Sequence, residues 1–544
     1  MKVQKGPSLV PKEDLHHPPL VIELPSGLKS VTIHCNKNNI PKKNFYKADY
    51  KKMYSSFAGY NWNALYEIQD VDVATEHFQN VIKGIIDETV PSQKVRKRRK
   101  FPPWFTPEII SKLKTKNRLH KRIKRGGGGS DLENCKLRHA QLRREAKKLI
   151  QVAQRNYHNN FESRIARDPN EFWKFIKQKK TNVDNSAILR VGNRILQRPN
   201  EVADAFAEYF RSVFRASGNG FPSLQAIGGC SGRRNIRISR IERHVVEKAL
   251  GKLKPKMSMG PDEIPPFIFK DCRVVLSAPL TFIYNLVLRT KTFPSLWKIS
   301  KVVPIPKSSN TSEINNYRPI SLIPLSAKIF ESVLYDLLFP QTKCLITEYQ
   351  HGFYPGRSIE SNLMVFTNFI SEHLDKGGQV DAVYTDFAKA FDTVHHGILL
   401  RRLHDVGFDD NLQSLFSSYL SNRTQYVVYK GSISKLYNSP SGVPQGSVLG
   451  PYLFTLFVNN ILAVIKYSKV LLYADDMKLY HSIVSRQDCM QLQHDFDALV
   501  QWSVENDLPL NYKKCEKTNF TRKRKVICYE YIMEGENLRE VHLI

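Results

Sequence analysis

The sequence predicts an α+β fold, in which short strands and helices alternate without the regular order of βαβ units. From about residue 236, short runs rich in β-branched residues alternate with longer segments of helical periodicity. No Gly-x-Gly-x-x-Gly turn accompanies them, which argues against a doubly wound parallel sheet. The strand-like runs include residues 301–305, 380–385 and 426–429, and the helical segments include residues 326–338 and 358–374.

The chain carries a large positive charge. It has 544 residues, enough for two or three domains, and 41% of them are apolar, an ordinary share for a protein with a buried core. The 82 Lys and Arg exceed the 51 Asp and Glu by 31. This surplus predicts a polyanionic partner such as nucleic acid, because each phosphate contact releases counterions. Solubility and attraction to acidic membranes are the alternatives.

The cysteines and the hydropathy pattern predict a reducing, intracellular compartment, and we expect the protein in the cytoplasm and nucleus. Eight cysteines are scattered without a Cys-x-x-Cys pair, so a zinc site is not indicated and free thiols are expected. The first residues include Lys and Pro where a secretory signal needs an apolar run. The most apolar stretch, residues 275–288, is short and interrupted by polar residues, so we expect no membrane span.

A strongly basic segment divides the N-terminal region. Residues 1–30 are polar and Pro-rich, with one strand-like run at 20–24. Residues 94–125 contain fourteen Lys or Arg and one acid, a local charge of +13, and the glycine run 126–129 follows. The glycine run indicates a flexible break, with an engineered linker as the alternative. We interpret the basic segment as a nucleic-acid-binding element; a solvated helix face or a nuclear-import signal is the alternative.

A helix is predicted to begin at Ser130. Glu133 lies three residues further on, which is the spacing of a capping box. Apolar residues then recur at helical spacing, and this stripe indicates a packing face rather than a ligand site. Its members are Leu142, Ala146, Leu149, Ala153 and Tyr157.

Three aspartates occupy positions that suit a metal site. Asp386 directly follows a strand-like run, and a carboxylate at a strand end is held rigidly. Asp475 and Asp476 lie between the apolar runs 470–473 and 477–480, which predicts a tight hairpin with the acids at its tip. If this hairpin pairs beside the first strand, Asp386 and Asp475 can share metal ions. An ordinary surface turn is the alternative.

Such carboxylates fit the needs of nucleotidyl transfer. A primer 3′-hydroxyl must attack an α-phosphorus while pyrophosphate leaves, and two Mg²⁺ ions about 3.5–4 Å apart can assist both oxygens. Mg²⁺ prefers oxygen ligands and takes one or two carboxylates besides substrate phosphates. Three aspartates in two segments are therefore sufficient.

Seven motifs occur in the order found in one polymerase family. They are Lys256-Met-Ser-Met-Gly-Pro-Asp262, Asn316-Tyr-Arg-Pro-Ile-Ser-Leu322, His351-Gly-Phe-Tyr-Pro-Gly-Arg-Ser358, Tyr384-Thr-Asp-Phe-Ala-Lys-Ala-Phe-Asp392, Ser441-Gly-Val-Pro-Gln-Gly-Ser447, Tyr473-Ala-Asp-Asp476 and Leu510-Asn-Tyr-Lys-Lys-Cys515. With them, residues 236–520 resemble the reverse transcriptase of non-LTR (LINE-type) retrotransposons, particularly the jockey-like group. Each motif alone is weak, whereas seven in order are specific.

The resemblance implies a right-hand polymerase with fingers, palm and thumb and a mainly helical, basic N-terminal extension. It assigns residues 1–30 to a remnant of an endonuclease and 31–235 to a basic linker region that binds RNA or target DNA. It assigns residues 236–485 to fingers and palm, and 486–544 to a thumb-like segment, complete or not. A truncated copy without a working endonuclease is therefore expected.

The same resemblance implies a metal site. Asp386, Asp475 and Asp476 match the catalytic carboxylates, of which Asp386 and Asp475 are expected to bind the metals directly, with Asp476 in support. Phe387 would add a backbone carbonyl. The implied cofactor is a pair of Mg²⁺ ions, for which Mn²⁺ can substitute.

Three residues match positions that select the nucleotide. Phe391 matches a steric gate against the ribose 2′-hydroxyl, with a core phenylalanine as the alternative. Gln445 and Gly446 match positions that contact the incoming nucleotide and the template. They lie in a loop where glycine lets the backbone approach a ligand closely.

Three cations complete the implied site. Lys307 and Arg318 resemble residues that hold the triphosphate, and both supply donors for phosphate, with plain surface cations as the alternative. Lys514 resembles a lysine that protonates pyrophosphate, with a solvated lysine as the alternative. Lys389 and Asp392 belong to a matching motif, but no role is assigned to them.

The implied function is RNA-directed DNA polymerase activity on an RNA template, a DNA primer or target, and dNTPs, with synthesis primed from nicked target DNA. Two alternatives stay open. An RNA-dependent RNA polymerase can share the carboxylates, although Phe391 disfavours it. A decayed copy of the element could instead bind nucleic acid without polymerising. The oligomeric state is left open.

Overall fold

The computed structural model describes residues 2–5, 20–23, 43–92, 101–102, 104–124, 130–167, 172, 176, 189–192, 194–215, 235–308 and 312–541. The chain divides into two compact units. The larger comprises residues 1–39, 50–86 and 189–544, and the smaller comprises residues 40–49 and 87–188. The region expected as a basic extension, 31–235, therefore contributes to both units. The glycine run and most of residues 1–30 lie outside the described residues.

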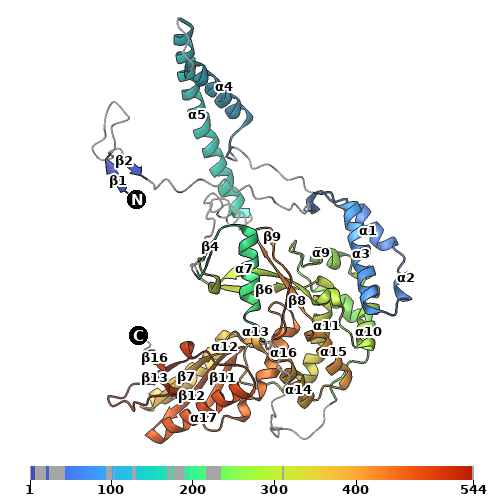
Figure 1. Cartoon of the computed structure of the whole chain (residues 1–544), viewed down its shortest axis with the longest axis vertical. Helices are drawn as coiled ribbons and strands as arrows, with labels where there is room; N and C mark the ends of the chain where they lie inside the picture. The colour runs from blue at the N-terminus through green and yellow to red at the C-terminus, as the bar shows by residue number, and fades with distance from the viewer. Residues whose placement is uncertain are drawn as a thin grey trace. The chain divides into compact units, whose positions relative to one another are not determined.

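The smaller unit contains a pair of contacting helices, α4 (Pro107–Lys124) and α5 (Ser130–Arg167), which lie side by side in Figure 1. α5 begins at Ser130, where the sequence predicts a helix start. Leu142 and Ala146 are buried, so this part of the apolar stripe is confirmed as a packing face. An ion pair of 2.6 Å between Lys112 and Glu145 joins the two helices.

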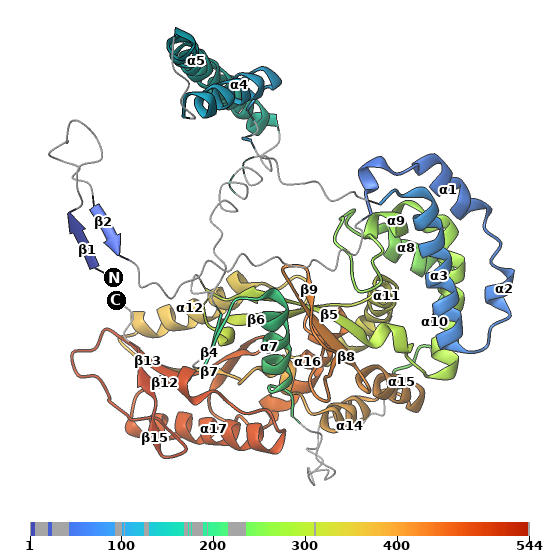
Figure 2. The same cartoon turned by 45° about the horizontal axis from the view of Figure 1, so that its top comes forward.

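A five-stranded sheet in the larger unit carries the three aspartates. Its order is β11 (Lys469–Tyr473), β12 (Asp476–Ile483), β7 (Gln379–Asp386), β13 (Glu516–Thr521) and β16 (Arg539–Glu540). Neighbours are antiparallel except for the parallel pair β13 and β16. Helices α12 (Ile359–Asp375) and α17 (Arg486–Glu505) lie on opposite sides of this sheet (Figure 2). The hairpin predicted at residues 470–480 is confirmed.

Strand β7 is buried on both faces. On one face, Val380 and Ala382 pack with Phe366 and Ile370 of α12. On the other face, the carboxylate of the buried Asp381 accepts hydrogen bonds from Tyr531 and Gln379, each of 2.9 Å. A central strand held from both sides has little freedom, so the residue at its end is fixed in position.

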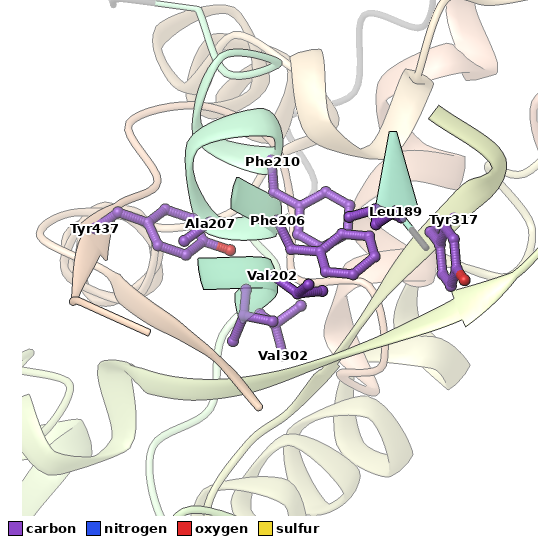
Figure 3. Packing of buried hydrophobic residues seen from close by; sticks show 9 residues of the cluster. Leu189, Val202, Phe206, Ala207, Phe210, Val302, Tyr317 and Tyr437 are labelled. Atoms are coloured by element: carbon purple, nitrogen blue, oxygen red, sulfur yellow. The ribbon is translucent and has the colours of Figure 1, made fainter. Parts of the chain in front are cut away.

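A second sheet lies within the same unit. Its order is β10 (Tyr437–Asn438), β8 (Thr424–Tyr429), β5 (Ile299–Pro306) and β6 (Tyr317–Leu322), and β9 (Ser432–Ile433) pairs with β8. Helix α7 (Pro199–Arg211) packs on it. Figure 3 shows Val202, Phe206 and Phe210 of α7 directed toward side chains of the sheet. The ring centroids of Phe206 and Tyr317 are 4.8 Å apart in an edge-to-face arrangement.

The remaining elements surround these two sheets or form separate hairpins. Among the described residues, the other α-helices are α1 (Tyr50–Gly59), α2 (Asn63–Tyr66), α3 (Val71–Thr89), α8 (Arg243–Gly251), α9 (Pro266–Asp271), α10 (Arg273–Thr290), α11 (Leu325–Thr342), α13 (Ala390–Thr393), α14 (His396–Val406), α15 (Asp410–Leu420) and α16 (Leu449–Val458). The two-stranded hairpins pair β1 (Lys2–Lys5) with β2 (Leu20–Glu23), β3 (Leu189–Val191) with β4 (Arg194–Leu196), and β14 (Ile532–Met533) with β15 (Glu536–Asn537).

The expected mixture of helices and sheets is confirmed. The helices predicted at 326–338 and 358–374 correspond to α11 and α12, and the three predicted strands correspond to β5, β7 and β8. Within the described part of the chain, no helix is both long enough and apolar enough to cross a bilayer.

Phe206→Ala should lower the free energy of unfolding of the larger unit by about 3–5 kcal/mol, because it removes a fully buried ring from the α7 interface. Urea unfolding followed by tryptophan fluorescence measures this change. Glu208→Ala, at an exposed position of the same helix, should change it by no more than about 0.5 kcal/mol. Equal effects of the two substitutions would contradict the packing of α7 on the sheet.

Candidate active site

The carboxylates meet where β7 pairs with β12. Asp386, the last residue of β7, is the direct cross-strand partner of Asp476, the first residue of β12. Side chains of such partners project from the same face, with Cβ atoms about 4.5–5.5 Å apart. Like charges in this position repel each other, so the pair favours a nearby cation.

Lys514 supplies one positive charge at this point. It lies in the short helix η5 (Tyr512–Lys514), and its Nζ is 2.7 Å from Oδ2 of Asp386. The backbone of this segment is fixed to the end of β7, because the N–H of Asn511 donates to the carbonyl of Asp386 at 2.7 Å. Phe387 is buried and pairs with Leu510 in an isolated antiparallel bridge. Lys514 is therefore placed beside the carboxylates by backbone contacts and is itself 63% exposed.

The environment disfavours negative charge on the hairpin acids. Burial raises the pKa of Asp475, and the charges of Asp476 and Asp386 raise it further. Burial also raises the pKa of Asp476, again with help from Asp386, while Lys514 and Lys478 lower it. Binding of a cation would therefore relieve both the desolvation and the mutual repulsion of these groups.

The donor set fits a hard divalent cation. Carboxylate oxygens are the ligands that Mg²⁺ prefers, and Asp386, Asp475 and Asp476 would provide them. Among the described residues, however, no three His, Cys, Asp or Glu side chains already form a metal-binding cluster.

The turn that carries Asp475 has an unusual backbone. Tyr473 and Asp476 are paired, so Ala474 and Asp475 form a two-residue loop. Ala474 has a φ of +60°, at the position where a type II′ turn requires a positive φ and favours glycine. An alanine there costs on the order of 1–3 kcal/mol and persists only if its surroundings hold it.

Phe391 lies at the edge of the site. Its ring stacks on Phe454 with centroids 4.7 Å apart and meets the exposed Phe353 edge-to-face at 5.9 Å. The side chain is only half-buried. One side of the ring is thus fixed by packing, while part of it remains accessible, an arrangement compatible with a rigid steric boundary.

The loop at residues 441–446 rests on the Phe391 segment. Gln445 donates through Nε2 to both carboxylate oxygens of Asp392 at 3.0 Å, and Ser441 donates to the backbone carbonyl of Asp392 at 2.7 Å. Gly442 has a φ of +78°, and a Cβ there would overlap the carbonyl oxygen of Phe391. Asp392, to which sequence reasoning assigned no role, therefore fixes the side chain of Gln445.

Gly446 allows the same loop to approach β6. It has a φ of +122°, and a Cβ at this position would overlap the carbonyl oxygen of Ser321. The N–H of Ser321 donates to the carbonyl of Gln445 at 2.7 Å. The loop is thus tied both to the Phe391 segment and to the second sheet.

Several cations reach the same region. Burial lowers the pKa of Lys307, and the positive charges of Lys389, Arg318 and Lys514 lower it further, while Asp392 raises it. Arg318 is paired with Ile305 across β5 and β6, and the Lys307 ammonium donates to the carbonyl of Asn315 at 3.1 Å. The structure therefore brings the three predicted cations within electrostatic range of one another.

Lys389 is a fourth cation that the sequence left without a role. Its Nζ lies 4.6 Å from the ring centroid of Tyr209 of α7, a cation–π distance. Its φ of +53° is in the left-handed region. Lys389 belongs to the motif that contains Asp386, but its contact partner Tyr209 lies 180 positions upstream, so the motif could not predict this contact.

Asp392 should make stability depend on pH. Burial raises its pKa from 3.8 to about 6, against the lowering effects of Lys389, Gln445 and Lys307. The folded state thus binds this proton more tightly than the unfolded state, so the stability from Asp392 falls as the pH rises through about 4 to 6. Asp392→Asn removes the charge, and its free energy of unfolding relative to wild type should be more favourable at pH 7.5 than at pH 5. A difference independent of pH in urea titrations would contradict the buried carboxylate.

Comparisons with known proteins bear on this site. Residues 305–531 match a family model described as "Reverse transcriptase (RNA-dependent DNA polymerase)". The RNA-directed DNA polymerase from mobile element jockey of Drosophila funebris is 25% identical over 481 residues, 83% of this chain and 51% of that protein. The probable RNA-directed DNA polymerase from transposon BS of Drosophila melanogaster is 28% identical over 402 residues, 70% of this chain and 44% of that protein.

A solved structure of apo telomerase from Candida tropicalis, truncated from its C-terminal domain, covers 45% of this chain and 53% of its own, with a TM-score of 0.32 and 12% identity. The chain spans about half the length of the jockey protein that it matches. The matched segment contains all the aspartates and cations of the site. Residues 305–531 are therefore similar to a reverse transcriptase domain, and most of the chain is similar to the RNA-directed DNA polymerases of the mobile elements jockey and transposon BS.

Proposed function

We propose that this chain is an RNA-directed DNA polymerase that extends a DNA primer on an RNA template by two-metal-ion nucleotidyl transfer from dNTPs. The observation that carries the proposal is the pairing of Asp386 with Asp476, beside Asp475, inside the matched domain. Opposed carboxylates at strand ends are a costly arrangement unless cations bind there. The named relatives are RNA-directed DNA polymerases, which supports the substrate class.

We assign the metal-binding role to Asp386 and Asp475, with Asp476 in support and the backbone carbonyl of Phe387 as a further ligand. Two Mg²⁺ ions, or Mn²⁺ in their place, would activate the primer hydroxyl and stabilise the leaving oxygens. Lys514 would donate a proton from Nζ to the departing pyrophosphate, and its position 2.7 Å from Asp386 supports this role. Each step then uses a group that the sheet or η5 holds in place.

The nucleotide would be bound by the groups around the Phe391 segment. Lys307 and Arg318 would bind the triphosphate, since both supply charged donors for phosphate oxygens. Phe391 would exclude the ribose 2′-hydroxyl, with its ring supported by Phe454. Gln445 and Gly446 would contact the incoming nucleotide and template, with Gln445 oriented by Asp392.

We assign the sheet of β7, β11, β12 and β13, with α12 and α17, to the palm, and the sheet of β5 and β6 to the fingers. α17 and β13 lie within residues 486–544, the segment expected to be thumb-like, but we assign these two elements to the palm because β13 is a strand of the carboxylate-bearing sheet. The basic helices α4 and α5 would bind RNA or target DNA, because most of their described Lys and Arg side chains are exposed and could contact phosphates. The proposed reaction in the cell is target-primed synthesis at a DNA nick, and we place the protein in the cytoplasm and nucleus.

Purified protein should extend a DNA primer on an RNA template in the presence of Mg²⁺ and dNTPs. Asp475→Asn should reduce extension by at least about 100-fold, because it removes one charged group that stabilises the transition state. Gel analysis of a labelled primer measures both. Asp497→Asn, an exposed aspartate on α17, is the matched control and should leave extension unchanged.

The outcomes separate the competing functions. Extension with rNTPs as efficient as with dNTPs would instead favour an RNA polymerase. Template binding in a filter assay without any extension by the wild type would favour a protein that only binds nucleic acid, for which the net charge of +31 would be sufficient. Equal extension by wild type and Asp475→Asn would refute the assignment of the metal site.

A further inference from the structure

A short segment extends the carboxylate-bearing sheet next to the hairpin. The N–H of His351 donates to the carbonyl of Leu472 at 2.9 Å, and the N–H of Leu472 donates to the carbonyl of Tyr349 at 3.0 Å. Gln350 and Leu472 thus form an isolated parallel bridge at the outer side of β11. This contact brings residues 349–352 to the end of β11, where the Ala474–Asp475 turn begins.

The side chain of Gln350 is directed to that turn. It is 1% exposed, and its Oε1 accepts a hydrogen bond from the N–H of Ala474 at 3.1 Å and another from the N–H of Gly352 at 2.8 Å. Its Nε2 has no hydrogen-bond partner among the described residues. An unpaired buried donor is unfavourable. The two hydrogen bonds that Gln350 does make are both accepted by its Oε1, so this oxygen is the functional part of the amide.

Gly352 makes this approach possible. A Cβ at Gly352 would overlap the nitrogen of Ala474 and would lie 2.8 Å from the carbonyl carbon of Tyr473. Any other residue would push the segment away from the turn. Gly352 and Gln350 therefore form one unit against the backbone of the turn, which we call the turn clamp.

We propose that Gln350 is a positioning residue, which holds the strained Ala474–Asp475 turn so that Asp475 and Asp476 are presented toward Asp386. Ala474 has a positive φ that alanine rarely adopts, and the hydrogen bond from its N–H to Gln350 fixes that peptide. Without the acceptor, the turn would relax and the carboxylates would leave the position needed for metal binding. This role rests on the proposed polymerase function of the carboxylates.

The test replaces Gln350 with a residue of similar size that cannot accept a hydrogen bond. Gln350→Met should lower kcat for dNTP addition about tenfold or more, while the KM for dNTP and the Kd for primer–template change less than about twofold. Mn²⁺ binding, measured by electron paramagnetic resonance without any turnover, should weaken about tenfold. Gln425→Met is the matched control, since Gln425 is buried on β8 of the second sheet and accepts a hydrogen bond from Tyr437 there.

A second substitution tests the strain directly. Glycine adopts a positive φ at little cost, so adding Ala474→Gly to Gln350→Met should restore at least half of the loss in kcat on a logarithmic scale. If Gln350→Met does not fold, Gln350→Glu keeps an acceptor oxygen and should extend primers at saturating Mg²⁺ within about tenfold of wild type.

Three results would overturn the role of Gln350. They are unchanged kcat and Mn²⁺ affinity in folded Gln350→Met, equal losses in Gln425→Met, and no rescue by Ala474→Gly. A wild type that binds Mn²⁺ but does not extend primers would refute the polymerase proposal, and the Mn²⁺ comparison would still decide the role of Gln350.

Discussion

Repulsion between two opposed carboxylates is the constraint on which this site depends. Asp386 and Asp476 are cross-strand partners, and Asp475 adjoins them in the turn. Ordinary sheet packing gives no reason to place like charges there, and their cost has to be offset by cations. Lys514 offsets part of it at 2.7 Å from Asp386, and under the proposed function the divalent cations that bind with the substrate would offset the rest.

The surrounding fold keeps the carboxylates from separating. β7 packs against α12 on one face, is held on the other by the hydrogen bonds of Asp381, and is paired on both edges, so Asp386 is kept beside the hairpin. The turn is held against the sheet by the turn clamp, although its alanine has a positive φ. Strain at a functional turn is maintained in this way by buried contacts that the rest of the sheet supports.

Local patterns in the sequence predicted the elements that depend on neighbouring residues. The hairpin followed from two apolar runs separated by Ala474 and Asp475, and the end of β7 followed from a β-branched run that stops at Asp386. The contacts that orient the site were not predictable, because they join distant positions. Asp392 and Gln445 are 53 residues apart, and Gln350 and Ala474 are 124 apart.

The central claim is that the carboxylates of Asp386 and Asp475 bind divalent cations together with substrate. Anomalous diffraction from crystals of the protein with primer–template, a non-hydrolysable dNTP analogue and Mn²⁺ tests it most directly. We predict Mn²⁺ bound to both carboxylates and to the triphosphate, with Lys514 no longer paired to Asp386. Mn²⁺ absent from these carboxylates while the triphosphate is bound beside them would contradict the claim.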